Sequence, residues 1–297
     1  MRVTQNSRRG HLQLCGVEFG RSRNPLNKLT KSPINLVQLT DQHLFGDPQA
    51  TLRGVPTLPA LRATLAAARD DIAACEAILA TGDLVQDDPG GYAHFRREFA
   101  ALGKPVLCLP GNHDDVPAMR AALKGDPFQL DGVFDRGNWR VLLLDSTIPG
   151  KTGGALSEAT LQQLDRELAQ APDRHVLVCL HHHPVTMRSR WLDTVGLSNA
   201  DAFFVALKRH SNVRAVLFGH VHQSLDAVVN GVRILATPST CSQFRPLSQD
   251  FAIDDAPPAY RKLTLHPDGR IDTEVIWVAA EVQAPATTLR ATSQSRK

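Results

Sequence analysis

Five short polar stretches of the chain each follow an apolar run, and together they hold seven of its twelve histidines. They combine carboxylates, imidazoles and one carboxamide, which are side chains that bind metal ions and transfer protons. The ends of neighbouring strands can meet at one edge of a sheet, so these side chains can converge on a two-metal centre. The stretches are Asp41-Gln42-His43, Gly82-Asp83, Gly111-Asn112-His113-Asp114, His181-His182-His183-Pro184 and Gly219-His220-Val221-His222.

The spacing within these stretches suits metal binding. Asp41 and His43 are two residues apart, so both side chains can point from one turn into one cavity and hold one cation. Asp83 stands alone and is suited to bridge two cations, because a carboxylate has lone pairs to share. The remaining candidate ligands are the amide oxygen of Asn112 and the imidazoles of His181, His220 and His222.

These residue types indicate which metals and which reaction to expect. Nitrogen and oxygen ligands without a thiolate favour Mn²⁺, Fe²⁺ or Zn²⁺ over Ca²⁺, Mg²⁺ or Cu⁺. Two such cations about 3.5 to 4 Å apart lower the pKa of a bridging water and neutralise phosphate oxygens during in-line displacement. His113 can donate a proton to the leaving oxygen, and Asp114 can orient its ring and keep it cationic. The sequence therefore predicts hydrolysis of a phosphoester.

Length and composition predict a single large domain. At 297 residues with 42% apolar content, the chain can bury an extensive core. Its net charge of +3 is uneven, because residues 1–33 carry +6 and leave the remainder at −3. Nucleic-acid binders usually present a basic face on the folded domain. We therefore expect no nucleic-acid partner, and a nuclease stays an alternative against which the acidic body of the chain argues.

The chain shows no membrane or disulfide pattern. No apolar run approaches the roughly 20 residues that a membrane span needs, and no secretory signal pattern precedes the domain. We expect no membrane association and a cytoplasmic location. The five cysteines lack the spacing of a disulfide framework or a zinc site. Cys75, Cys108 and Cys179 lie in or beside apolar runs, so we expect small buried hydrophobic residues there.

Three segments are expected along the chain: a disordered basic extension over residues 1–33, a folded domain over 34–279 and a flexible tail over 280–297. A start codon assigned too far upstream would explain the extension. Within the domain, apolar runs alternate with helical patterns, which predicts an α/β fold of two sheets packed face to face with helices outside. We expect strands at 34–39, 77–80, 106–109, 140–144, 175–180 and 213–218, helices at 57–72, 92–102, 157–169 and 199–208 with Thr57 and Ser157 as N-caps, and hairpins at Asn230-Gly231 and Pro267-Asp268-Gly269.

The order DxH, GD, GNHD, H and GHxH resembles the motif pattern of the calcineurin-like metallophosphoesterases. The resemblance implies a four-layer α/β/β/α fold with a dinuclear site, in which His113 is the catalytic, phosphate-contacting histidine. Family members place a ligand directly after the strand, so His181 is preferred within the triple histidine, with His182 as the fallback and His183 as a structural residue. The implied ligands are Asp41, His43, Asp83 and His222 for the first metal and Asp83, Asn112, His181 and His220 for the second.

Over about residues 34–278 the sequence is similar to the bacterial class III 3′,5′-cyclic AMP phosphodiesterases. This resemblance implies hydrolysis of 3′,5′-cyclic AMP to 5′-AMP by a metal-bridging hydroxide. The implied metals are iron or manganese, with zinc as a third option, and a homodimer is the implied assembly. The implied phosphate contacts are His43, Asp83, Asn112, His113 and His222. The similar segments are Leu143-Leu144-Asp145-Ser146, Gly154-Ala155-Leu156-Ser157, His181-His182-His183-Pro184-Val185, Leu197-Ser198-Asn199-Ala200 and residues 236–244.

Several alternatives stay open at this point. The same centre would suit other nucleotides or glycerol-type phosphodiesters and monoesters, and a catalytically inactive scaffold would share the fold. Many metallophosphoesterases carry a second acid in a GDxxD run. Here Gly82-Asp83-Leu84-Val85 is followed by Gln86 and then Asp87. This departure argues against a phosphoprotein phosphatase. Residues 237–244 either cover a nucleotide or form an ordinary connection. Trp191 either packs on a base or is buried.

Overall fold

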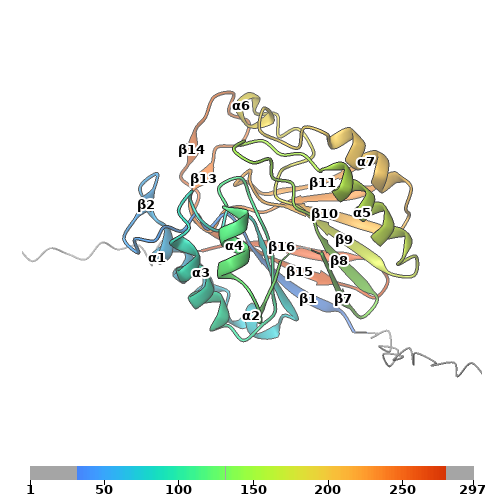
Figure 1. Cartoon of the computed structure of the whole chain (residues 1–297), viewed down its shortest axis with the longest axis horizontal. Helices are drawn as coiled ribbons and strands as arrows, with labels where there is room; N and C mark the ends of the chain where they lie inside the picture. The colour runs from blue at the N-terminus through green and yellow to red at the C-terminus, as the bar shows by residue number, and fades with distance from the viewer. Residues whose placement is uncertain (1–31, 131, 279–297) are drawn as a thin grey trace, which may run out of the picture.

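A computed structural model describes residues 32–130 and 132–278 of the chain. Two six-stranded sheets pack face to face, and helices cover both outer faces (Figure 1). This arrangement confirms the four-layer α/β/β/α fold expected from the sequence. The expected extension over residues 1–33, apart from its last two residues, and the expected tail over 280–297 lie outside the described residues.

The first sheet holds three of the five polar stretches. Its strands β1, β4, β5 and β6 are parallel; β15 pairs with β1 in the antiparallel direction, and β16 pairs with β15 in the antiparallel direction. Successive side chains of β1 point to opposite faces, so Val37 packs under the helices while Leu36 faces the second sheet. In sheet order the strands are β16 (Ile271–Trp277), β15 (Ala259–Leu265), β1 (Ile34–Leu39), β4 (Ala77–Thr81), β5 (Val106–Leu109) and β6 (Phe128–Leu130).

The second sheet holds the other two stretches. Its strands β8, β9, β10 and β12 are parallel, and the edge strands β7 and β11 are antiparallel. The central strands are buried on both faces, which explains their continuous apolar sequence. In sheet order the strands are β11 (Leu225–Val229), β12 (Val232–Ala236), β10 (Val213–Phe218), β9 (His175–Cys179), β8 (Trp139–Leu143) and β7 (Gly132–Arg136).

Helices close the two outer layers. Helices α1 to α4 pack on the first sheet, and α5, α6 and α7 pack on the second. The predicted N-cap at Ser157 is confirmed, since its side chain accepts a hydrogen bond from the Thr160 amide. No helix in the described part of the chain is long and apolar enough to cross a membrane. The helices are α1 (Thr57–Ala67), α2 (Arg69–Ala74), α3 (Gly91–Ala100), α4 (Val116–Ala122), α5 (Glu158–Ala169), α6 (Arg190–Asp193) and α7 (Ala200–Lys208).

The helix predicted over 57–72 is two helices. Ala68 ends α1 and begins α2 with ψ near 0°, a bend that lets Leu61 of α1 and Ile72 of α2 enter one core cluster. The prediction of Thr57 as N-cap was also wrong. Pro56 occupies that position, and Thr57 is the first, buried helical residue.

Both predicted hairpins are confirmed. Asn230 and Gly231 both adopt positive φ between β11 and β12, as a tight two-residue turn requires. Residues 237–244 follow β12 and most of them are buried, while Phe244 at their end lines a cavity. Their end begins a small sheet of β13 (Gln243–Phe244) and β14 (Ile253–Asp254), and a second small sheet joins β2 (Thr51–Leu52) to β3 (Val55–Pro56).

Three of the cysteines were predicted to be small buried hydrophobic residues. Cys75, Cys108 and Cys179 each expose 3% of their surface or less, and all three belong to core clusters. The prediction is confirmed, and these thiols contribute to the core by their packing.

Candidate metal centre

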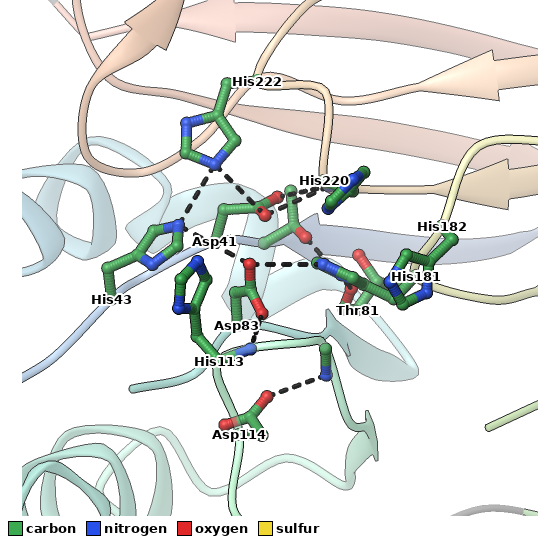
Figure 2. Close-up of polar contacts among 12 residues, drawn as sticks. Asp41, His43, Thr81, Asp83, His113, Asp114, His181, His182, His220 and His222 are labelled. Carbon is green, nitrogen blue, oxygen red and sulfur yellow. Dashed lines mark hydrogen bonds and ion pairs between the residues drawn. The ribbon is translucent and has the colours of Figure 1, made fainter. Parts of the chain in front are cut away.

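The five polar stretches meet where the carboxyl ends of strands from both sheets face one another. Asp41 follows β1 and Asp83 follows β4 in the first sheet, while His181 follows β9 and His220 follows β10 in the second. Figure 2 shows these side chains directed toward a common centre. Parallel strands present their carboxyl ends at the same edge of a sheet, so two stacked sheets deliver ligands from both sides.

One cluster joins the DxH stretch to the HxH stretch. Asp41, His43 and His222 each place a potential ligand atom within 4.8 Å of the others. His222 Nε2 lies 3.3 Å from Asp41 Oδ1 and 3.1 Å from His43 Nε2. Two imidazole nitrogens facing each other beside a carboxylate form a donor set suited to a cation.

A second cluster lies on the other side of Asp83. Asp83, His181 and His220 also place one ligand atom each within 4.8 Å of the others. The amide oxygen Oδ1 of Asn112 is buried without a hydrogen-bond partner. Buried polar atoms are rarely left unpaired, so this oxygen fits a bound cation.

Asp83 connects the clusters. Its Oδ2 lies 3.3 Å from His181 Nε2 and 3.8 Å from His43 Nε2. Its Oδ1 is fixed separately, because it accepts a hydrogen bond of 2.9 Å from the His113 amide. One carboxylate oxygen is therefore shared between the two groups, as the sequence predicts for a bridging ligand.

Backbone carbonyls orient three of the imidazoles. His181 Nδ1 donates to the Thr81 carbonyl at 2.8 Å and His222 Nδ1 to the Ser242 carbonyl at 2.6 Å. His220 uses the opposite nitrogen, since its Nε2 donates to the Val195 carbonyl at 3.0 Å. Such outer contacts fix which ring nitrogen is left for a metal. The free nitrogen is Nε2 in His181 and His222 and Nδ1 in His220.

The backbone at the candidate ligands is unusual. Five of these residues have positive φ, a conformation that residues other than glycine rarely adopt and that concentrates at functional sites. Neighbouring glycines make the close packing feasible, because a Cβ at Gly82 would overlap the His181 ring and a Cβ at Gly111 would overlap the Asp83 carboxylate. The φ values are 56° at Asp41, 50° at His43, 52° at Asp83, 68° at His220 and 48° at His222.

The electrostatics of the site favour charged carboxylates and neutral imidazoles at His43 and His220. Burial would raise the pKa of Asp83, but its pairing with His181 holds that pKa well below the ordinary value. Burial lowers the pKa of His43 to about 3 and keeps that of His220 well below its usual range. For His181 burial acts in the same direction, yet the charge of Asp83 outweighs it and raises the pKa to about 9. A cation beside Asp83 would take the place of that proton.

His113 points toward the clusters, but Asp114 does not orient it. The Asp114 carboxylate turns away from the clusters (Figure 2). It accepts hydrogen bonds from the Gly111 and Leu84 amides and the Tyr92 hydroxyl. These donors hold the loop after β5 against the loop after β4. Burial and the charge of Asp83 raise the pKa of Asp114 to about 7.

The neighbours of the His113 ring come instead from the loop after β4. His113 Nδ1 lies 3.0 Å from Asp87 Oδ2 and 2.8 Å from Gln86 Nε2. The expected contact with Asp114 therefore has to be corrected, because adjacency along the chain placed the wrong carboxylate beside the ring. In the sequence, Asp87 stood out only because it follows Gln86, one position after the second acid of the GDxxD pattern.

The three residues of the triple histidine lie in different surroundings. His181 enters a cluster, whereas His182 Nδ1 contacts the Ser146 hydroxyl at 2.8 Å. The His183 ring stacks on the His220 ring at 5.5 Å between centroids. The packing places His182 and His183 behind the ligand candidates.

A cavity of about 260 Å³ opens onto the centre. Candidate ligands line one part of it, including His43, Asn112 and His222. Seven further residues line the rest, and sequence reasoning singled out only Trp191 among their aromatic side chains by itself. They are Arg53, Thr152, Trp191, Leu192, Val195, Phe244 and Phe251.

The sequence profile of calcineurin-like phosphoesterases matches residues 34–224. The chain belongs to this family, whose members use a dinuclear metal centre. It is 42% identical over 255 residues, 86% of this chain and 93% of the relative, to 3′,5′-cyclic adenosine monophosphate phosphodiesterase CpdA of Pseudomonas aeruginosa. It is 43% identical over 244 residues, 82% of this chain and 89% of the relative, to the protein of the same name in Escherichia coli K12.

Solved structures share the fold at low sequence identity. A dimetal phosphatase from Danio rerio aligns with a TM-score of 0.59 and 16% identity, covering 84% of this chain and all of that one. A purple acid phosphatase from yellow lupin aligns with a TM-score of 0.55 and 12% identity, covering 89% of this chain and 58% of that one. These likenesses concern the arrangement of sheets and helices.

Proposed function

We propose that this protein hydrolyses 3′,5′-cyclic AMP to 5′-AMP. The observation that carries the proposal is the position of Asp83 Oδ2 between His181 and His43, which joins two clusters at the wall of one cavity. The names of the Pseudomonas and Escherichia relatives, similar over most of both chains, support cyclic AMP as the substrate. An inactive scaffold would not need its candidate ligands to converge in this way.

Two metal ions fit the donor set described above. We propose iron, manganese or both, with zinc as the third option, because nitrogen and oxygen ligands without a thiolate suit these ions. When bound, the ions neutralise phosphate charge and lower the pKa of water. The proposed ligands are Asp41, His43, Asp83 and His222 for one ion and Asp83, Asn112, His181 and His220 for the other.

The protein's own groups bind the phosphate and move a proton. A water molecule loses a proton to the solvent and its oxygen forms a bond to phosphorus, while the bond from phosphorus to the 3′ oxygen breaks. The leaving oxygen takes a proton from His113, which the solvent then returns to the imidazole. The ring of His113 is directed toward His43 and Asp83, which places it beside the phosphate position (Figure 2). The proposed phosphate contacts are His43, Asp83, Asn112, His113 and His222.

Asp87 is a positioning residue in this scheme. Its carboxylate lies 3.0 Å from His113 Nδ1, which leaves Nε2 as the nitrogen free to act on the leaving oxygen. A carboxylate on the far side of an imidazole fixes the orientation of the ring. Asp87 thus takes the role that the sequence suggested for Asp114.

The test is a substrate panel on protein that is stripped of metal and reconstituted with Mn²⁺ or Fe²⁺. We expect 3′,5′-cyclic AMP to be turned over to 5′-AMP with a higher kcat/KM than 2′,3′-cyclic nucleotides, glycerophosphodiesters or bis(4-nitrophenyl) phosphate. Ca²⁺ should not restore activity, because the nitrogen-rich ligand set does not suit it. A clear preference for a non-cyclic ester would contradict the proposed substrate.

Variants of the GNH stretch test the site assignment. Asn112→Ala should abolish hydrolysis by removing a ligand, and His113→Ala should lower the kcat for cyclic AMP by about 10²- to 10⁴-fold by removing the proton donor. Near-full activity in both variants would overturn the assignment. Trp277→Ala on β16 is the control, because this residue lies outside the cavity.

We also propose residues 34–279 as the catalytic domain and a homodimer as the assembly. Light scattering coupled to size-exclusion chromatography measures the assembly directly. A chain limited to residues 34–279 should keep the kcat/KM of the full chain, and a large loss would assign a role to the terminal segments.

A further inference from the structure

Three aromatic rings line the cavity beside the metal centre. The Trp191 ring meets Phe244 and Phe251 edge-on, with centroid distances of 5.2 Å and 5.0 Å, and Phe244 and Phe251 are 5.5 Å apart. Phe251 exposes 44% of its surface, which a core residue of this size would not do. We call Trp191, Phe244 and Phe251 the aromatic box. Metal binding and proton transfer make no use of it.

The aromatic box begins directly beside a candidate metal ligand. The Phe244 ring lies parallel to the His222 ring, with 4.1 Å between centroids and 7° between planes. The box and the candidate ligands line the same cavity. When the phosphate of a ligand occupies the metal centre, any other group of that ligand can therefore reach the aromatic box.

A cation is held over the box from another part of the chain. Arg53 and Gly54, both with positive φ, form the two-residue turn between β2 and β3. The guanidinium carbon of Arg53 lies 4.3 Å from the Phe251 centroid and 5.9 Å from the Phe244 centroid. Arginine stacks on aromatic faces and still offers in-plane hydrogen-bond donors.

The segments that carry the box are tied together. The backbone amide of Trp191 donates to the Gln249 carbonyl at 3.3 Å, and Arg190 Nη2 lies 2.9 Å from Asp250 Oδ1. These contacts join α6 to the loop between β13 and β14, and Figure 1 shows both at the same end of the molecule. The box is thus assembled in advance, which reduces the entropy lost when a ligand binds.

We propose that the aromatic box together with Arg53 binds the nucleobase of the substrate. This inference rests on the proposed function. It goes beyond that function because it assigns the choice among cyclic nucleotides to residues that contact the base and not the phosphate. Flat faces of a base stack on the rings, and the Arg53 donors reach acceptor atoms on its edge. A purine offers more stacking area than a pyrimidine, so the box favours purines.

The experiment compares cyclic AMP with methyl ribofuranoside 3,5-cyclic phosphate, which keeps the sugar and the cyclic phosphate but lacks the base. The metal-loaded wild-type enzyme should favour cyclic AMP by roughly 10-fold or more in kcat/KM, since stacking of one base on aromatic side chains accounts for about 5- to 100-fold. Phe251→Ala and Arg53→Gln should reduce this ratio by raising KM for cyclic AMP. Turnover of the base-free compound should stay at the wild-type value.

Two further variants separate base binding from a structural effect. Phe251→Leu keeps an apolar side chain but no ring, so it should reduce the ratio nearly as much as Phe251→Ala. Trp277→Ala removes an aromatic residue of equal exposure, 43%, on β16 and should leave the ratio unchanged.

The possible failures are distinguishable. Equal kcat/KM for the two compounds in the wild type, or equal loss for both in the variants, overturns base binding and leaves the proposed function intact. If the wild type hydrolyses neither compound but cleaves bis(4-nitrophenyl) phosphate, both the proposed function and the inference fail. A pyrimidine cyclic nucleotide turned over as well as cyclic AMP overturns the purine preference.

Discussion

The metal centre and the aromatic box share one cavity but differ in construction. The metal centre stands on central strands of two large sheets, and nearly all of its candidate ligands are buried. The aromatic box stands on a four-residue helix and a two-stranded hairpin, and Phe251 is largely exposed. The groups that carry out the chemistry need a fixed geometry and stand on rigid elements. The residues that select the substrate stand on elements that can change without disturbing the core.

Removal of the bridging carboxylate is the strongest test of this division. Asp83→Ala should release both metal ions and lower kcat by at least about 1000-fold, since loss of even one group that stabilises the transition state reduces kcat by 10²- to 10³-fold. Metal content by mass spectrometry and turnover of cyclic AMP measure the two effects. Asp165→Ala on the surface of α5 is the matched control. If the variant keeps both ions, Asp83 is not the bridge.

Loss of the proton donor should leave the metals in place. His113→Ala should lower kcat by about 10²- to 10⁴-fold, the usual range for a general acid. Metal content should stay at the wild-type value, because His113 is absent from the proposed ligand set. A substrate whose leaving group needs no proton, such as a 4-nitrophenyl ester, should lose far less activity. Equal loss for both substrates would argue against proton donation.

Asp87 and Asp114 should affect different properties. Asp87 is 66% exposed, so Asp87→Ala should lower kcat roughly 10-fold through His113 and change the unfolding free energy by less than about 0.5 kcal/mol. Asp114→Ala leaves the amides of Gly111 and Leu84 without an acceptor and should destabilise the fold by about 2 kcal/mol. Denaturant unfolding and kcat measured on both variants decide between them. The reverse pattern would restore the sequence-based role of Asp114.

The same contrast explains what the sequence could predict. Asp41, Asp83 and His220 were predictable because each lies just past an apolar run, and the strands that carry them are long enough to give a clear pattern. Asp87 was missed because its partner His113 lies on a different loop, and chain adjacency favoured Asp114. Arg53 lies in a two-residue turn and Phe251 in a loop, each between strands of only two residues, which have no periodicity to detect.

Weakening the tether of the aromatic box should have the smallest effect. Asp250→Ala removes the ion pair with Arg190, whose partners are 70% and 88% exposed, so the pair stabilises the box by at most about 1 kcal/mol. We expect KM for cyclic AMP to rise less than about fivefold, with no change in metal content or in turnover of the base-free analogue. Asp70→Ala, which removes an equally exposed pair with Arg69, should change neither constant. A loss of metal in the Asp250 variant would mean that the box also supports the metal centre, and the division between the two regions would fail.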